Sequence, residues 1–262
     1  MKKIDLSEEF FRSPIAHRGL HDCNESFGSG KTENSLSAIQ EAINKGYGIE
    51  VDIQLSEDNI PIVFHDYSLR RLVGRSELIK GMLAKDLESI RLPNGDTIPC
   101  LESVLDLVSG RVPLLIEIKD QDGKLGHKVG RLEKEVAKAL KCYEGPIALM
   151  SFNPCSVKKI AEYLPNLPRG LITESFVSAN WPEVDEKRLK GLRKFTAIKN
   201  LELSFISHEF TDLQNGRMIK LSEGLPRFCW TVRNAHEANR AFDIVDNITF
   251  EGFYPTGKNL II

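Results

Sequence analysis

Short runs of β-branched and other apolar residues alternate along the chain with segments whose apolar residues recur at helical spacing. Alternation of this kind is typical of βαβ units and a parallel sheet. The expected strands are Pro14–His17, Gly48–Gln54, Pro61–His65, Leu114–Lys119, Ile147–Ser151, Arg169–Ile172, Leu203–Ser207, Phe228–Val232 and Phe250–Tyr254. The helices expected between them include Ser35–Lys45, Leu101–Val108, Gly130–Lys141, Pro154–Tyr163 and Ala235–Val245.

The second and third expected strands are too close in sequence to be parallel neighbours. Six residues separate Gln54 from Pro61, whereas a parallel crossover needs about a dozen or more. They should therefore form an antiparallel hairpin that turns near Glu57–Asn59, with His65 opposite or next to Asp52. The remaining eight strands predict a TIM (β/α)₈ barrel. The hairpin opens an insertion after the second barrel strand, at about residues 55–100, within a single domain.

Composition narrows the functional classes. The chain has 262 residues, close to the roughly 250 of one such barrel. Its net charge of −2 offers no basic surface for nucleic acid. It has neither a polybasic segment for an anionic membrane nor an apolar run long enough to cross one. Five scattered cysteines and an acidic N-terminus without a signal sequence predict a soluble cytoplasmic protein. The sequence does not indicate the oligomeric state.

Four clusters of polar residues fall on or at the ends of the predicted strands: His17-Arg18, Glu50-Val-Asp52, His65-Asp66 and Glu117-Ile-Lys119. In barrels, ligand-bearing side chains stand at the carboxyl ends of the strands. Each cluster has a plainer alternative. Glu50 and Asp52 could form the solvated face of an open sheet, Glu117 and Lys119 a structural ion pair, and each histidine a core residue.

Together, the clusters favour phosphoryl transfer. Three carboxylates, Glu50, Asp52 and Glu117, suit Mg²⁺ or Ca²⁺ better than zinc. Two histidines can share general acid and general base work, and Arg18 and Lys119 can bind a phosphate.

Five motifs occur in an order and spacing that resemble the glycerophosphodiester phosphodiesterase family: Ile15-Ala-His-Arg-Gly19, Glu33-Asn-Ser35, Gly48-Ile-Glu-Val-Asp-Ile-Gln54, Ile60-Pro-Ile-Val-Phe-His-Asp66 and Leu115-Ile-Glu-Ile-Lys119. Leu69, Arg71 and Gly74 extend the similarity, and weaker matches occur at Ser151-Phe152 and Trp230-Thr-Val232.

This resemblance implies a TIM barrel with a small insertion after its second strand. It implies His17 and His65 as catalytic acid and base, Arg18 and Lys119 on the phosphate, and Glu50, Asp52 and Glu117 on the metal. Glu33, Asn34 and Trp230 would support the site. The implied reaction converts glycerophosphodiesters, such as glycerophosphocholine, to glycerol 3-phosphate and an alcohol.

Two positions depart from the family pattern. Thr32 replaces a proline before the Glu-Asn pair, and Gly252-Phe253-Tyr254-Pro255 replaces a Thr-Asp dipeptide shortly before a late proline. The second departure removes an aspartate whose implied role is to support the site through hydrogen bonds or loop closure. Two other functions stay open: a phospholipase D-like enzyme acting on lysophospholipids or sphingolipids, and a catalytically silent barrel that binds phosphodiesters.

Overall fold

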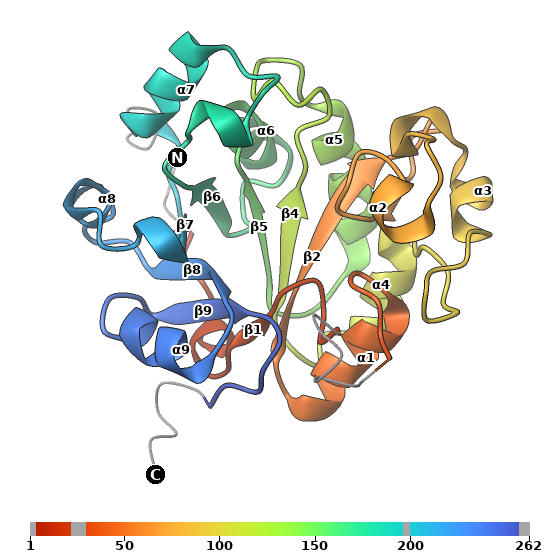
Figure 1. Cartoon of the computed structure of the whole chain (residues 1–262), viewed down its shortest axis with the longest axis horizontal. Helices are drawn as coiled ribbons and strands as arrows, with labels where there is room; N and C mark the ends of the chain where they lie inside the picture. The colour runs from red at the N-terminus through yellow and green to blue at the C-terminus, as the bar shows by residue number, and fades with distance from the viewer. Residues whose placement is uncertain (1–3, 22–29, 196–199, 257–262) are drawn as a thin grey trace.

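Eight parallel strands close into a barrel in the computed structural model, which describes residues 4–21, 30–195 and 200–256 (Figure 1). The barrel strands are β1 (Ile15–Ala16), β2 (Gly48–Leu55), β4 (Leu114–Ile118), β5 (Ile147–Ser151), β6 (Arg169–Thr173), β7 (Phe205–Glu209), β8 (Arg227–Val232) and β9 (Asn247–Phe250). Because β1 pairs with both β2 and β9, the sheet has no open edge within the barrel. The predicted TIM barrel is confirmed.

Helices lie outside the ring of strands in Figure 1. They are α1 (Leu36–Lys45), α4 (Leu101–Val108), α5 (Arg131–Ala139), α6 (Pro154–Tyr163), α7 (Glu186–Arg193), α8 (Gly216–Leu221) and α9 (Ala235–Phe242). Local signals set their ends. The Ser35 side chain accepts a hydrogen bond from the Ala38 amide at the start of α1, and Gly46 ends that helix in a left-handed conformation.

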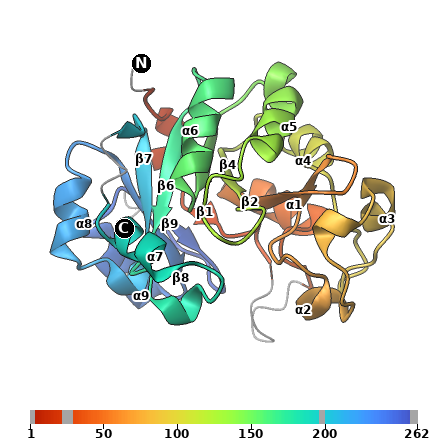
Figure 2. The same cartoon turned by 90° about the horizontal axis from the view of Figure 1, so that it is seen from above.

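The strand β3 (Pro61–Val63) pairs antiparallel with β2, in the register Ile53↔Val63. The Phe64 amide donates to the Asp52 carbonyl, so His65 lies next to Asp52 along the hairpin, as predicted. The chain then continues through α2 (Arg70–Val73) and α3 (Ala84–Glu88) before α4. Figures 1 and 2 both show α2 and α3 on one side of the barrel.

Two hydrophobic layers support the barrel. Val51, Ile53 and their neighbours face the helices, whereas Ile15, Leu115 and Phe205 belong to a smaller cluster inside the ring. Phe10, from a short N-terminal helical turn, belongs to the inner cluster and stacks on Phe228. The insertion has an apolar cluster of its own, made of Ile62, Phe64, Leu69, Ile79, Ala84, Leu87, Ile90, Leu92 and Ile98.

Two predicted strand positions are wrong. The last strand is Asn247–Phe250, not Phe250–Tyr254, because its neighbour β1 has only two residues and its pairing ends at Phe250. The seventh strand begins at Phe205 and ends at Glu209, whereas Leu203–Ser207 was expected. Leu203 packs in an apolar cluster with Leu171 and Val157 before the strand starts.

No helix of the described residues is long and apolar enough to cross a bilayer. Four of the five cysteines lie in the described part of the chain, Cys100, Cys142, Cys155 and Cys229, and all four are free thiols. Cys23 lies outside the described residues.

Candidate active site

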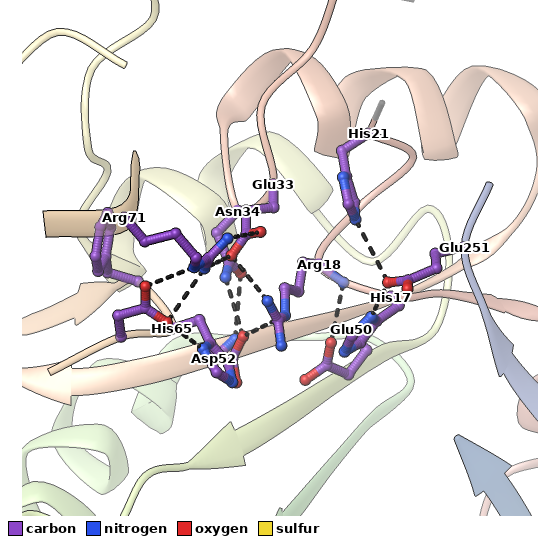
Figure 3. Close-up of polar contacts among 12 residues, drawn as sticks. His17, Arg18, His21, Glu33, Asn34, Glu50, Asp52, His65, Arg71 and Glu251 are labelled. Carbon is purple, nitrogen blue, oxygen red and sulfur yellow. Dashed lines mark hydrogen bonds and ion pairs between the residues drawn. The ribbon is translucent and has the colours of Figure 1, made fainter. Parts of the chain in front are cut away.

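The predicted clusters meet around one cavity of about 680 Å³ at the carboxyl ends of the barrel strands. The lining includes seven of the predicted residues: His17, Arg18, Glu50, His65, Glu117, Lys119 and Trp230. The other three are buried: Glu33 and Asp52 each contact Arg18, and Asn34 contacts Asp52 (Figure 3).

A tight turn after β1 places the first cluster. Arg18 (φ 56°) and Gly19 (φ 79°) both have a left-handed backbone conformation. A side chain at Gly19 would come within 2.9 Å of the Ala38 backbone, so only glycine fits against the start of α1. The turn points the Arg18 amide at Glu50, whose Oε2 accepts its hydrogen bond at 3.0 Å.

Glu50, Asp52 and Glu117 each offer a carboxylate oxygen, and these oxygens lie within 4.8 Å of one another. All three residues are buried. Burial and repulsion from Asp52 and Glu117 raise the pKa of Glu50 well above its usual range. Crowded, buried carboxylates are stabilised by a cation, and three hard oxygens suit a divalent metal ion. The donor set therefore fits the predicted metal.

The two cations of the site already contact carboxylates. Lys119 Nζ lies 2.9 Å from Glu117 and 3.3 Å from Asp52. Burial lowers the pKa of Lys119, but these charges outweigh it and the pKa is raised. Arg18 lies 2.9 Å from Glu33 and its Nε 3.3 Å from Asp52. The ion pair considered as the alternative for Glu117 and Lys119 thus exists, and both residues also line the cavity.

Asn34 fixes the buried Asp52. Its Nδ2 donates to Asp52 Oδ2 at 3.0 Å, and its Oδ1 accepts from the Asp52 amide at 3.3 Å. Asn34 itself is left-handed (φ 58°), a conformation that asparagine tolerates better than most residues. The preceding Thr32, where the family has proline, accepts a hydrogen bond from the Asn94 amide of the insertion.

Arg71 of α2 connects the insertion to both sides of the site, a contact that the sequence did not predict. It donates to Asp66 at 2.6 Å and to Glu33 at 2.6 and 2.7 Å. Asp66 in turn contacts His65 Nδ1 at 2.7 Å, and Glu33 accepts from Arg18. One exposed guanidinium thus joins the carboxylates that hold His65 and Arg18.

Glu251, directly after β9, is a functional candidate that the sequence did not predict. Its Oε2 lies 2.6 Å from His17 Nδ1, and its Oε1 lies 2.8 Å from Arg233. The loss of the late aspartate therefore does not leave this strand end without a carboxylate. Burial raises the pKa of Glu251, but the hydrogen bond and charge of His17, with Arg233, lower it to about 2. Burial, together with Arg18, lowers the pKa of His17 to about 4.

Each histidine thus has a carboxylate on Nδ1, which leaves its Nε2 for the cavity that both rings line. A sequence model of the glycerophosphoryl diester phosphodiesterase family matches residues 17–248, which include nearly all of this site. The chain belongs to this family. It is therefore a phosphoric diester hydrolase, and the silent binding barrel is set aside.

Individual relatives agree with this assignment. The Bacillus subtilis (strain 168) protein YhdW is 28% identical over 235 residues, which are 86% of this chain and 87% of that protein. A glycerophosphodiester phosphodiesterase from Caldanaerobacter subterraneus is 27% identical over 64% of this chain and 69% of its own. The Oleispira antarctica phosphodiesterase, solved with its product sn-glycerol-3-phosphate, is 22% identical. It covers 91% of this chain and 92% of its own, with a TM-score of 0.71.

Glu251→Gln tests the unpredicted partner of His17 in this phosphodiesterase. The amide keeps the size of the side chain but removes the charge that favours protonated His17. The pKa of His17 should then fall further, and whichever limb of the kcat/KM–pH profile His17 governs should move to lower pH. We expect kcat to fall about 10–100-fold. Glu223→Gln, the same change at an exposed position, should leave the profile in place, and an unmoved profile for Glu251→Gln would contradict the assignment.

Arg71→Met tests the link from the insertion. Loss of the guanidinium frees Asp66 and Glu33, so His65 and Arg18 should lose their alignment and kcat/KM should fall about 10–100-fold. The melting temperature should change little, because Arg71 is about half exposed. The control is Arg75→Met, which removes an exposed arginine of the same insertion; among the described residues its ion pair is with Glu77, two positions along the chain. Equal kinetics for the two variants would show that Arg71 does not position the site.

Proposed function

We propose that this chain hydrolyses glycerophosphodiesters, such as glycerophosphocholine, to glycerol 3-phosphate and an alcohol with the help of Mg²⁺ or Ca²⁺. The observation that carries the proposal is that two carboxylate-bound histidines line one cavity with Glu50 and Glu117, which form a buried cluster with Asp52. Family membership supports the reaction class, and the product bound to the Oleispira enzyme supports the substrate class.

Glu50, Asp52 and Glu117 would hold the metal ion. Such an ion supplies a positive charge that stabilises the negative charge on the phosphoryl oxygens during the reaction. The Arg18 amide already fixes one oxygen of Glu50, and Asn34 fixes Asp52. The ligands are therefore held in place before any ion binds, which lowers the cost of binding it.

His17 and His65 would move the protons. A carboxylate on Nδ1 holds each ring with Nε2 toward the cavity, where one ring takes a proton from the attacking oxygen and the other delivers one to the leaving oxygen. Arg18 and Lys119 would bind the phosphate through the N–H groups that their carboxylate partners leave available. Because the pKa of His17 is lowered to about 4, this ring is neutral at pH 7.

The phospholipase D-like alternative has one observation in its favour. Tyr67 and Leu78 line the cavity and are exposed apolar side chains (43% and 45%), the kind of surface that an acyl chain would contact. We also retain, as predictions, a cytoplasmic location without stable membrane association, and a small-molecule substrate rather than nucleic acid.

A coupled assay tests the proposal. The protein is incubated with glycerophosphocholine, glycerophosphoethanolamine, glycerophosphoglycerol or lysophosphatidylcholine, with Mg²⁺ or Ca²⁺, and released glycerol 3-phosphate is oxidised by its dehydrogenase. We expect release from the water-soluble diesters and loss of release with a chelator. Choline release from lysophosphatidylcholine alone would favour the alternative. No turnover of any substrate with either metal would contradict the proposal.

A further inference from the structure

One side of the cavity is aromatic. Phe152 follows β5, Trp230 belongs to β8, and Trp181 follows a 3₁₀ turn (Ser178–Asn180) after β6; all three line the cavity. Phe152 makes edge-to-face contacts with both tryptophans, at ring distances of 5.2 Å to Trp181 and 5.4 Å to Trp230. The three rings therefore form one continuous wall.

A buried carboxylate stands in this wall. Glu174, the residue after β6, lines the cavity but is only 5% exposed. Neutral groups hydrogen-bond it: the Trp181 indole Nε1 donates to Oε1, and Asn180 and the Phe176 backbone also contact the carboxylate. In the described part of the chain, no lysine, arginine or histidine forms an ion pair with Glu174. Burial, together with the charge of Glu209, raises the pKa of Glu174.

A carboxylate in such a place is costly unless a cation meets it. Three other buried carboxylates line the cavity. Glu50 and Glu117 belong to the metal cluster, and Asp120 accepts hydrogen bonds from the Leu125 amide and from Asn153 Nδ2. Glu174 has no cationic partner among the described residues, although it faces the same cavity. Aromatic faces attract cations, and most strongly when the cation is desolvated. The aromatic rings and the carboxylate would therefore both be stabilised by a bound cation.

We propose that Glu174, Trp181, Phe152 and Trp230 form a subsite for a positively charged alcohol of the diester, an alkylammonium such as choline or ethanolamine. The inference rests on the proposed function for the identity of the substrate. It adds a residue, Glu174, that selects among substrates without touching the bond that breaks.

The layout of the barrel agrees with this subsite. The residues proposed to bind phosphate and metal belong to β2 and β4 or follow β1 and β4. The aromatic wall and Glu174 lie on or directly after β5, β6 and β8, apart from Trp181 in the loop after β6. In the ring, β5 and β6 follow β4 on the side away from β2, and β8 lies opposite β4. A diester whose phosphate lies near Arg18 can therefore extend one arm toward Glu174 within a single cavity. A neutral glycerol arm would leave this carboxylate without a cation.

Two substrates of the same shape test the charge. One is glycerophosphocholine. The other is the diester of glycerol phosphate with 3,3-dimethylbutanol, an alcohol in which carbon replaces the charged nitrogen of choline. The wild type should prefer the choline ester in kcat/KM by at least about 10-fold. Glu174→Gln should abolish this preference and leave the neutral ester within about 2-fold of the wild type, because glutamine keeps an acceptor for Trp181. Glu183→Gln, an exposed glutamate of the same loop, is the matched control and should keep the preference.

A binding measurement separates this inference from the proposed reaction. Trp181 and Trp230 are the two tryptophans of the chain, so intrinsic fluorescence reports directly on the wall. Titration with choline chloride should give a saturable change in the wild type and in Glu183→Gln. The dissociation constant should rise at least about 10-fold in Glu174→Gln.

The outcomes are distinct. If no diester is hydrolysed but choline binding depends on Glu174, the proposed function fails and the subsite stands. If diesters are hydrolysed but both esters respond equally to Glu174→Gln, or choline gives no Glu174-dependent titration, the subsite is wrong.

Discussion

Asp52→Asn is expected to raise the concentration of Mg²⁺ or Ca²⁺ needed for the half-maximal rate by at least about 100-fold. Asparagine keeps the size of the side chain and an oxygen for the Asn34 hydrogen bond, but it removes one of three negative charges from the cluster. The charge also matters to Lys119, which lies 3.3 Å from Asp52. Steady-state rates across a metal titration give the midpoint directly.

The matched control is Asp106→Asn, the same change at an exposed position of α4. It should titrate like the wild type. Because the Asp52 carboxylate is buried among cations that lower its pKa, thermal unfolding should accompany the kinetics, so that lost folding is not mistaken for lost metal. If folded Asp52→Asn titrates with metal as the wild type does, the ligand assignment is wrong.

Single replacements of the two histidines should differ in how they respond to the leaving group. The ring that donates a proton is needed for choline or ethanolamine, which are poor leaving groups, but hardly for a nitrophenolate. Its replacement by alanine should lower the rate on glycerophosphocholine about 10²–10⁴-fold and spare the nitrophenyl ester of glycerol phosphate. Replacement of the other ring, the general base, should damage both substrates alike.

The account requires that one of His17→Ala and His65→Ala is rescued by the better leaving group and that the other is not. The two variants serve as controls for each other, since each removes a carboxylate-bound imidazole from the same cavity. Near-normal rates on glycerophosphocholine in both, or the same response to the leaving group, would require another acid–base pair.

The parts of the site that could be predicted from sequence are those fixed by local geometry. The alternation of Glu50 and Asp52 along one strand places both on the inner face of the barrel. The six-residue spacing to Pro61 sets the hairpin, and the hairpin brings His65 next to Asp52. Parallel strands then bring their carboxyl ends to one rim, so Glu117 joins the group without any further information.

The contacts that were missed join residues far apart in the chain. Glu251 lies 234 positions from His17, and Arg71 lies 38 from Glu33. Neither distance leaves a pattern that periodicity can detect. A signal for Glu251 did exist, because it directly follows the apolar run Ile248–Phe250, as His17 follows Ile15–Ala16. The aromatic residues Phe253 and Tyr254 favoured a strand that continues beyond Glu251. In the structure, the pairing of β9 with the short β1 ends at Phe250.

Glu174 could not be predicted from the sequence for a different reason. A lone carboxylate after a strand is common on a protein surface, and only the fold shows that it is buried against Trp181 and faces the cavity.

The identity of the bond that breaks tests the central claim most directly. Phosphorus NMR follows glycerophosphocholine with the protein and Mg²⁺ or Ca²⁺, and it distinguishes the two phosphomonoesters that hydrolysis could release. The account predicts that the diester signal is replaced by that of glycerol 3-phosphate, and that a chelator stops the conversion. Release of phosphocholine instead, or a diester signal that stays unchanged with either metal, would contradict it.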